Sequence, residues 1–220
     1  NWVKWVTPLI WLAANIMTSK TTLPFASWPS SLSADKVASA APKISHIQSN
    51  NNLLTWVESK PLEGGRNVII GRSANGNVKD LIPSPFSHAS RVHEYGGRAY
   101  AFSKNTLYFV NAADQRIYQL DIGKKTPKAI TKAGPRFADL LVDNFNNQLI
   151  AVCEQHYDGA EPDNYLVALS LDKDNHQLQT LVSGADFYAY PRISPNGKSL
   201  CWIEWNHPHM PWDSTQLWSA

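Results

Sequence analysis

The feature that most constrains the fold of this chain is a strand pattern that recurs along it. Each repeat begins with a polar turn that contains asparagine, and an apolar strand follows the turn directly. With Leu54, Leu107, Leu149 and Leu200 as reference positions, the repeats are spaced by 53, 42 and 51 residues. A further strand follows each reference strand, and the first three repeats add a short final strand. Units of this kind, with a period of roughly 40–50 residues, are typical of β-propeller blades.

We therefore predict an all-β fold, an incomplete β-propeller of about three and a half four-stranded blades. Residues 43–220 are expected to form this partial propeller domain and to end within the fourth blade. A propeller needs at least about four blades to close its ring, so we expect open strand edges and uncovered apolar faces. We also expect the chain to be the front part of a larger protein.

A short helical segment precedes the predicted propeller. Residues 33–41 form a helix candidate, which Ser33 can cap and which Pro42 prevents from continuing. The candidate helix lies within an N-terminal extension that we assign to residues 17–42.

The first 16 residues have a different character. They are apolar but are interrupted by Lys4 and Pro8, and they are shorter than the roughly 20 residues that a membrane span requires. We interpret them as upstream sequence, with Met17 as the native start. The alternative is a secretory signal, because Lys4 precedes a short apolar run.

Composition limits the partners and the compartment. The 220 residues are 43% hydrophobic and 17% charged, as in globular proteins, and the net charge of +2 is spread along the chain. We therefore expect neither nucleic acid nor a membrane as a partner. The two cysteines, Cys153 and Cys201, lie within predicted strands and are expected to be free thiols, which favours a reducing, cytoplasmic setting.

No complete catalytic motif is present in the sequence. A nucleophile elbow requires Gly-x-Ser-x-Gly before a helix, whereas the nearest match, residues 71–75, lacks the second glycine and lies in a predicted hairpin. Phosphate-binding and dinucleotide-binding glycine patterns are also missing. We therefore assign no catalytic residue and no cofactor, and we expect the chain to be inactive by itself.

Residues 91–97, with the sequence Arg-Val-His-Glu-Tyr-Gly-Gly, contain the candidate substrate-binding residues His93, Glu94 and Tyr95. The two glycines permit a tight bend or a close backbone approach. A glutamate on the innermost strand of a propeller blade faces the central tunnel, where it can hold the ammonium group of a substrate or an arginine. The alternative is a charged turn that fixes a blade by hydrogen bonds, which is the common role of polar loop residues.

Two loops contain residue types that bind metals. Residues 205–213 include His207, His209 and Asp213, but a proline separates the histidines and no second ligand pair accompanies them. We predict no metal site there, and interpret the loop as one that lines a pocket or packs under the neighbouring blade. An acidic stretch at residues 156–163 has the equivalent place in the third repeat, and we interpret it as a solvated loop.

Three stretches of the sequence resemble the N-terminal propeller of prolyl oligopeptidase family serine peptidases, in the dipeptidyl-aminopeptidase and acylaminoacyl-peptidase branch. They are Trp28-Pro29-Ser30 with the helix candidate after it, residues 91–97, and residues 191–213. The resemblance extends from about Met17 to Ala220. It implies a seven-bladed propeller followed by an α/β-hydrolase domain with a Ser, Asp and His triad, and no position in this chain matches that triad.

The resemblance implies a function as the N-terminal propeller portion of a serine peptidase that hydrolyses short peptides. The activity would be of the aminoacyl-, dipeptidyl- or acylaminoacyl-peptidase type, and the propeller would gate access to a catalytic α/β-hydrolase domain missing from this chain. The expected partners are that domain and short peptides. The alternative is a non-catalytic β-propeller that binds a peptide or protein partner, which explains the strands and the aromatic residues equally well.

Overall fold

A computed structural model of the protein describes two separate units of the chain, with the boundary between Ala38 and Ser39. The described residues are 22–38, 42–50, 52–172 and 176–220. Met17 and the upstream segment 1–16 lie outside them. In the described part of the chain, no helix has both the length and the apolar character needed to cross a lipid bilayer.

The first unit contains the short helix α1 (Ala34–Ala38). Its amino-terminal end is capped as predicted, because Oγ of Ser33 accepts a hydrogen bond of 3.1 Å from the backbone N–H of Lys36. The last predicted helical positions, residues 39–41, lie outside the described residues.

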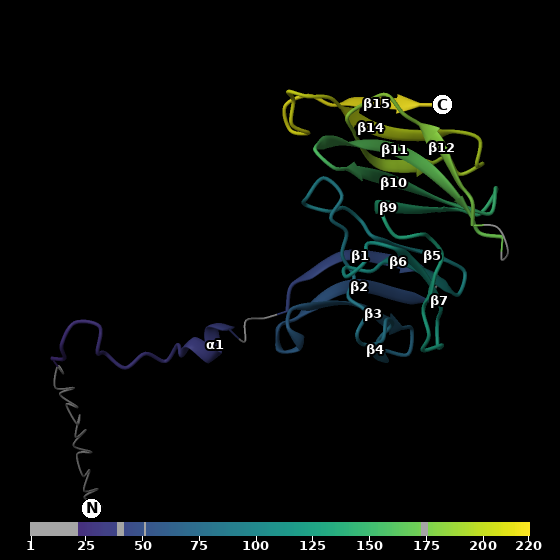
Figure 1. Ribbon diagram of the computed structural model, residues 1–220. Helices are drawn as coiled ribbons and strands as arrows, with labels where there is room; N and C mark the ends of the chain where they lie inside the picture. Colours follow the sequence, from purple (N-terminus) through teal and green to yellow (C-terminus); the bar gives the residue numbers. More distant parts are fainter. Residues whose placement is uncertain (1–21, 39–41, 51, 173–175) are drawn as a thin grey trace, which may run out of the picture. The chain divides into compact units, whose positions relative to one another are not determined.

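The second unit consists of four antiparallel sheets (Figure 1). The first sheet contains β1 (Ile44–Asn50), β2 (Leu53–Lys60), β3 (Arg66–Ser73) and β4 (Val78–Asp80). The second contains β5 (Tyr100–Ser103), β6 (Thr106–Val110), β7 (Ile117–Asp121) and β8 (Lys128–Ala129). The third contains β9 (Arg136–Asp143), β10 (Gln148–Tyr157), β11 (Ala160–Ser170) and β12 (Leu178–Val182). The fourth contains β13 (Phe187–Ile193), β14 (Leu200–Trp205) and β15 (Gln216–Ser219).

This arrangement confirms the predicted incomplete β-propeller. In every sheet the strands pair in chain order, which is the meander of a propeller blade. The reference strands of the sequence pattern are β2, β6, β10 and β14, the second strand of each sheet. Near the centre of the unit, the first strand of the third sheet contacts those of the second and fourth sheets.

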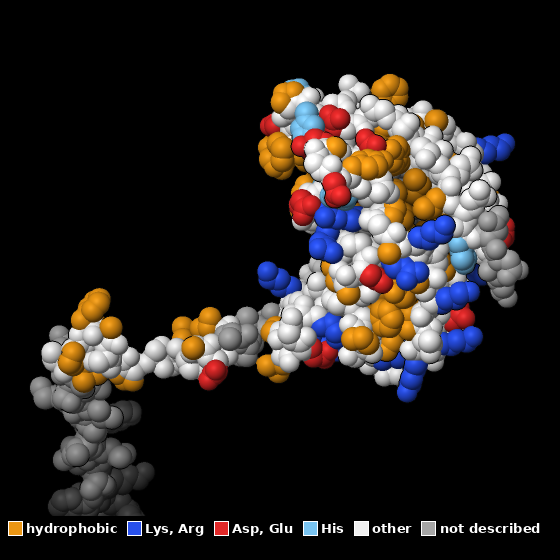
Figure 2. All heavy atoms as spheres, in the orientation of Figure 1, with side chains coloured by type: hydrophobic (Ala, Val, Ile, Leu, Met, Phe, Trp, Pro, Cys, Tyr) orange, Lys and Arg blue, Asp and Glu red, His pale blue; other side chains and the backbone are white. Residues whose placement is uncertain are grey.

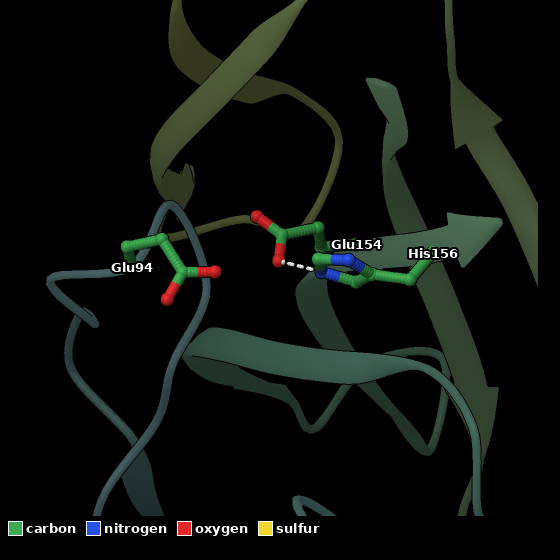
Figure 3. A group of neighbouring side chains, drawn as sticks. All are labelled: Glu94, Glu154 and His156. Atoms are coloured by element: carbon green, nitrogen blue, oxygen red, sulfur yellow. Dashed lines mark hydrogen bonds and ion pairs between the residues drawn. The ribbon is translucent and has the colours of Figure 1, made fainter. Parts of the chain in front are cut away.

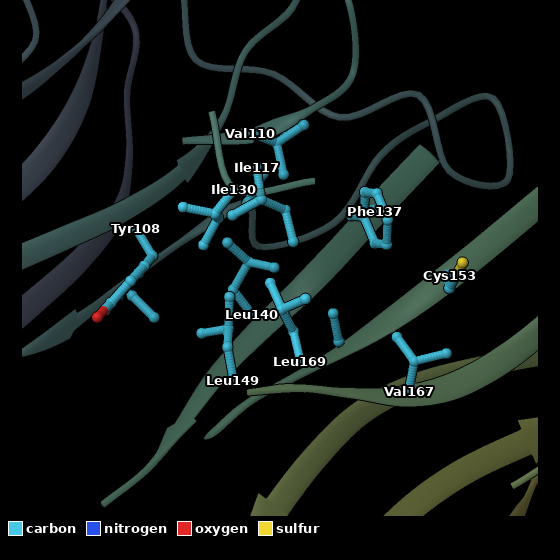
Figure 4. Close-up of a cluster of buried hydrophobic side chains, with 13 residues drawn as sticks. Tyr108, Val110, Ile117, Ile130, Phe137, Leu140, Leu149, Cys153, Val167 and Leu169 are labelled. Atoms are coloured by element: carbon cyan, nitrogen blue, oxygen red, sulfur yellow. The ribbon is translucent and has the colours of Figure 1, made fainter. Parts of the chain in front are cut away.

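The blades pack face to face because their central strands are apolar on both faces. In β6, Leu107 and Phe109 belong to the core between the first and second sheets. The alternate residues, Tyr108 and Val110, belong to the core between the second and third sheets (Figure 4). Side chains on a strand alternate between its two faces, so a continuous apolar run fills two inter-blade cores.

A third core lies between the third and fourth sheets. Val152 and Leu166 from the third sheet meet Tyr188 and Trp202 from the fourth. Val92, which belongs to the connection between the first and second sheets, also packs into this core. That connection therefore reaches across to blades that follow much later in the sequence.

Candidate functional site

The connection between β4 and β5 carries the three candidate substrate-binding residues in a turn at residues 92–95. His93 and Glu94 have left-handed backbone conformations, with φ of 53° and 64°. Non-glycine residues adopt such φ values infrequently, and they often do so at functional sites. Glu94 therefore lies in a turn before β5 and not on a strand.

The two glycines after this turn have the roles that the sequence predicted. Gly96 has φ of 78°, and a Cβ at this position would lie 2.6 Å from the carbonyl oxygen of Ser90. A Cβ at Gly97 would lie 2.9 Å from Oδ1 of Asp139. Gly96 thus permits the tight bend, and Gly97 permits the close approach to β9.

His93 is fixed to the third and fourth sheets. Its backbone N–H donates a hydrogen bond of 2.6 Å to Oε2 of Glu154 on β10. Its imidazole lies among the rings of Phe187, Trp205 and Tyr95, with centroid separations of 5.2, 5.5 and 5.7 Å. Burial lowers the pKa of His93, although the negative charge of Glu154 opposes the shift. The imidazole is therefore neutral at pH 7.

Glu94 is the exposed member of a charged cluster. Its side chain is 75% exposed, and Oε1 lies 2.6 Å from Nη1 of Arg136 on β9. The same nitrogen lies 3.3 Å from Oε1 of Glu154, whose side chain is 3% exposed. Nε2 of His156 lies 2.5 Å from that Glu154 oxygen, as Figure 3 shows. The hydrogen bond and the positive charge of Arg136 lower the pKa of Glu94.

Three residues of this cluster are of types that bind metal ions, and their proximity was not predicted from the sequence. Glu94, Glu154 and His156 each place a ligand atom within 4.8 Å of the others, and no other such group occurs among the described residues. The Arg136 guanidinium contacts both carboxylates and so already supplies positive charge between them. The geometry therefore favours an ion-pair network over a metal site at this position.

The loop between β14 and β15 packs on the fourth sheet, and its ligand types do not converge. The His207 ring lies against Phe187, with 5.0 Å between the centroids. Oδ2 of Asp213 accepts a hydrogen bond of 3.1 Å from the backbone N–H of Met210, while His209 is exposed. His207 and Asp213 therefore serve the fold of the loop.

The acidic stretch 156–163 is not the loop that we expected but the tip of the β10–β11 hairpin, where only residues 158 and 159 lie between the strands. Tyr157 pairs with Ala160 across this tip, which has the place equivalent to the β14–β15 loop. Tyr157, Asp158 and Glu161 are exposed, and Oδ2 of Asp163 accepts a hydrogen bond of 3.0 Å from the Tyr165 hydroxyl.

In the first sheet, Ser73 ends β3 and its hydroxyl donates to Oδ1 of Asn75 within the hairpin turn. Residues 71–75 thus belong to a hairpin, as predicted, with Ser73 as the last residue of the strand.

In three of the four sheets, the first strand has the same backbone irregularity. β1, β9 and β13 each contain a β-bulge, with His46, Asp139 and Tyr190 at φ of 51°, 51° and 54°. Both carboxylate oxygens of Asp139 accept backbone hydrogen bonds, 2.9 Å from the N–H of Arg98 and 2.7 Å from that of Tyr190. This buried aspartate thereby joins the second, third and fourth sheets.

The bulges and the turn surround a cavity of about 450 Å³. Its buried apolar wall residues are Val92, Ala138, Val152, Tyr188 and Trp205. The wall also includes the exposed His46, Tyr95 and Tyr190, the half-buried Arg98 and the buried Asp139. In Figure 2, the second unit is hollowed on its left-hand side, and acidic and basic side chains lie next to one another along that hollow.

The structure brings His93 and Tyr95 to this cavity and places Glu94 in the charged cluster beside it. Arg98 and Asp139 were not predicted as site residues. A signal for Asp139 exists, since it is an isolated acid within the apolar stretch 137–142. Arg98 carries no comparable signal, because only the fold brings it to the cavity wall.

Comparison with solved structures relates this propeller to known proteins. A puromycin-hydrolyzing peptidase from Mycobacterium tuberculosis is 36% identical in sequence over 91% of this chain, with a TM-score of 0.81. A puromycin hydrolase is 27% identical over 91% of the chain, also with a TM-score of 0.81. Both of these structural relatives are puromycin-hydrolysing enzymes. The chain spans 33% of the length of each of these two proteins.

More distant likenesses concern the fold alone. A nidogen/laminin complex is 13% identical over 74% of this chain and 57% of the matched chain, with a TM-score of 0.54. No protein-family model matches the chain. No curated protein matches it either.

Proposed function

We propose that this chain is the N-terminal propeller portion of a serine peptidase of the prolyl oligopeptidase family that hydrolyses short peptides. The observation that carries the proposal is the 36% identity to a puromycin-hydrolyzing peptidase over 91% of this chain. That peptidase is about three times as long, since the matched region is 33% of it. The remaining length has room for further blades and a catalytic domain.

In the proposed enzyme, the chemistry takes place outside these 220 residues. A serine attacks the scissile carbonyl, a histidine acts as the base and an aspartate orients the histidine. The propeller described here gates the approach of peptides to that centre. Rigid inter-blade cores suit this role, because a gate selects by size only if its walls keep their spacing.

The substrate-facing residues of the proposal are His93, Glu94 and Tyr95. The exposed carboxylate of Glu94 is available to the ammonium group of a peptide, which would share it with Arg136. His93 and Tyr95 border the neighbouring cavity and hold the turn in place. The proposal also includes a cytoplasmic setting, which the free thiols of Cys153 and Cys201 favour.

The test is to follow the reading frame of the source transcript past Ala220 and to express its whole product. We expect three further blades, a Gly-x-Ser-x-Gly elbow, and hydrolysis of aminoacyl, dipeptidyl or acylaminoacyl substrates and of puromycin. A serine-directed fluorophosphonate should label the long product and should not label the 220-residue chain. A product that ends without a hydrolase domain would overturn the proposal and would leave a non-catalytic propeller that binds a partner.

A further inference from the structure

The wall of the 450 Å³ cavity contains the guanidinium group of Arg98, which has no side-chain partner among the described residues. Arg98 is half-buried and lines the cavity beside Tyr95 and Tyr190. Among the described residues, none accepts a hydrogen bond from the Arg98 guanidinium and none forms an ion pair with it. Partly buried guanidinium groups ordinarily pair with a carboxylate or phosphate, because desolvation of an unpaired charge is unfavourable.

The nearest acid does not fill this role. The two carboxylate oxygens of Asp139 accept backbone hydrogen bonds, one from the N–H of Arg98 itself and one from that of Tyr190. The carboxylate is thus committed to the backbone of the bulges. Its distance from the Arg98 guanidinium exceeds that of an ion pair, so the guanidinium remains open toward the cavity.

The positive charge of Arg98 acts on two further basic side chains, Arg192 and His46, and the negative charge of Asp139 opposes its effect on both. Partial burial and the positive charge of Arg98 lower the pKa of Arg192. Partial burial and the same charge lower the pKa of His46. An anion beside Arg98 would reduce the repulsion between its guanidinium group and that of Arg192.

The remaining wall of the cavity indicates which kind of molecule bears the anionic group. Its buried surface is apolar and aromatic and includes Val92, Val152 and Trp205, and the exposed rings of Tyr95 and Tyr190 lie on its wall. A volume of about 450 Å³ is within the range of small-ligand sites, which hold roughly 300–1,000 Å³. A strongly hydrated inorganic anion would leave the apolar wall unused, whereas a carboxylate attached to an apolar side chain matches both parts.

We infer that this cavity binds the carboxylate of a short apolar peptide, with Arg98 as the anion-binding residue and the aromatic wall around the adjacent side chain. The inference deepens the proposed function by naming the substrate group that the propeller holds, and it rests on that function only for the source of the peptide. All the wall residues belong to this chain, so binding does not require hydrolysis. The carboxylate can come from the carboxyl terminus of the peptide or from an aspartate side chain.

The experiment is calorimetric titration of the 220-residue chain with N-acetyl-Phe-Leu and, separately, with the carboxyl-terminal amide of that peptide. We expect the free carboxylate to bind at least about tenfold more tightly than the amide, as for a charge-assisted hydrogen bond. Added salt should weaken binding of the carboxylate and leave that of the amide unchanged. N-acetyl-Asp-Phe-amide tests the other source of the carboxylate.

Two variants make the assignment specific. Arg98→Gln should remove the preference for the carboxylate, and Arg98→Lys should retain part of it. Arg72→Gln, at an exposed position on β3, is the matched control and should bind like the parent chain. Equal binding of acid and amide, no saturable binding of any carboxylate peptide, or an unchanged preference in Arg98→Gln would overturn the inference. Loss of hydrolysis in the longer product would overturn only the proposed enzyme.

Discussion

The backbone N–H of His93 donates a hydrogen bond to Oε2 of Glu154, a residue 61 positions later in the chain. The other oxygen of that carboxylate contacts both Arg136 and His156. A turn that connects the first two sheets is thereby attached to the third sheet. Because the Glu154 side chain is buried, its negative charge is balanced by these donors and not by water.

Replacement of Glu154 by glutamine should therefore destabilise the fold. The amide keeps the shape but loses the charge, and its NH₂ group must face groups that are themselves donors. We expect Glu154→Gln to lower the free energy of unfolding by about 1–3 kcal/mol, measured by urea denaturation. Glu161→Gln, at an exposed position in the same sheet, is the control. Equal stability of the two variants would show that the network contributes nothing.

The bend at Gly96 provides a second stability test. Gly96→Ala places a methyl group 2.6 Å from the Ser90 carbonyl oxygen at a φ of 78°. Gly76→Ala adds the same methyl group at a φ of 85° with no atom within 4 Å, so it measures the backbone strain alone. We expect Gly76→Ala to lower the free energy of unfolding by about 1–2 kcal/mol. Gly96→Ala should lower it by about 1–3 kcal/mol more, because of the added clash. Equal melting temperatures for the two variants would contradict the predicted clash.

The stability of the fold should fall in mild acid because of His88. This side chain is 3% exposed, and burial together with the positive charge of His46 lowers its pKa to about 3. An unfolded histidine titrates near pH 6.5, so below that value the unfolded chain binds a proton that the native chain does not. The free energy of unfolding should therefore decrease by about 1.4 kcal/mol per pH unit between pH 6 and pH 3 from this residue.

Urea denaturation at pH 7 and pH 5 measures this dependence. His88→Leu should have a weaker pH dependence than the parent chain, whatever its absolute stability. His209→Leu removes an exposed histidine and should leave the slope unchanged. An identical slope in His88→Leu would rule out His88 as the source.

The sequence predicted the blades well because their signal is local. Each polar turn and the apolar strand after it lie within about ten residues, and the strands β2, β6, β10 and β14 appear where the pattern places them. The helix cap at Ser33 is local in the same sense. No strand was predicted at β9 or β13, because the bulges at Asp139 and Tyr190 interrupt the alternation of side chains that marks a strand.

The candidate site was only partly predictable. The glycines at 96 and 97 indicated a bend and a close approach, and the structure shows both. The partners of the turn come from distant strands, so no spacing rule could have joined Glu94 to Arg136 or His93 to Glu154. Arg98 is a candidate binding residue only because its guanidinium group has no side-chain partner among the described residues. Such a property of the folded chain cannot be read from the sequence.

The two cysteines should differ in reactivity. Cys153 is buried in the core between the second and third sheets, and burial, followed by the charge of Glu154, raises the pKa of its thiol to about 12. Cys201 on β14 is half-buried and free. With a thiol-disulfide reagent at pH 8, one thiol should react in the native chain and the other only after unfolding. Cys201→Ser should remove the native reaction, and a fast reaction of Cys153 would contradict the structure.

Glu94 offers a test of the proposed gate in the longer product. Arg136 keeps its contact with Glu154 when Glu94 loses its charge, so Glu94→Gln should leave the network largely in place. If Glu94 holds the ammonium group of a peptide, the variant should raise KM for peptides with a free amino terminus and leave kcat unchanged. Peptides with a blocked amino terminus are the control. If the substitution changes kcat/KM by the same factor for free and blocked peptides, Glu94 does not bind the ammonium group and only pairs with Arg136.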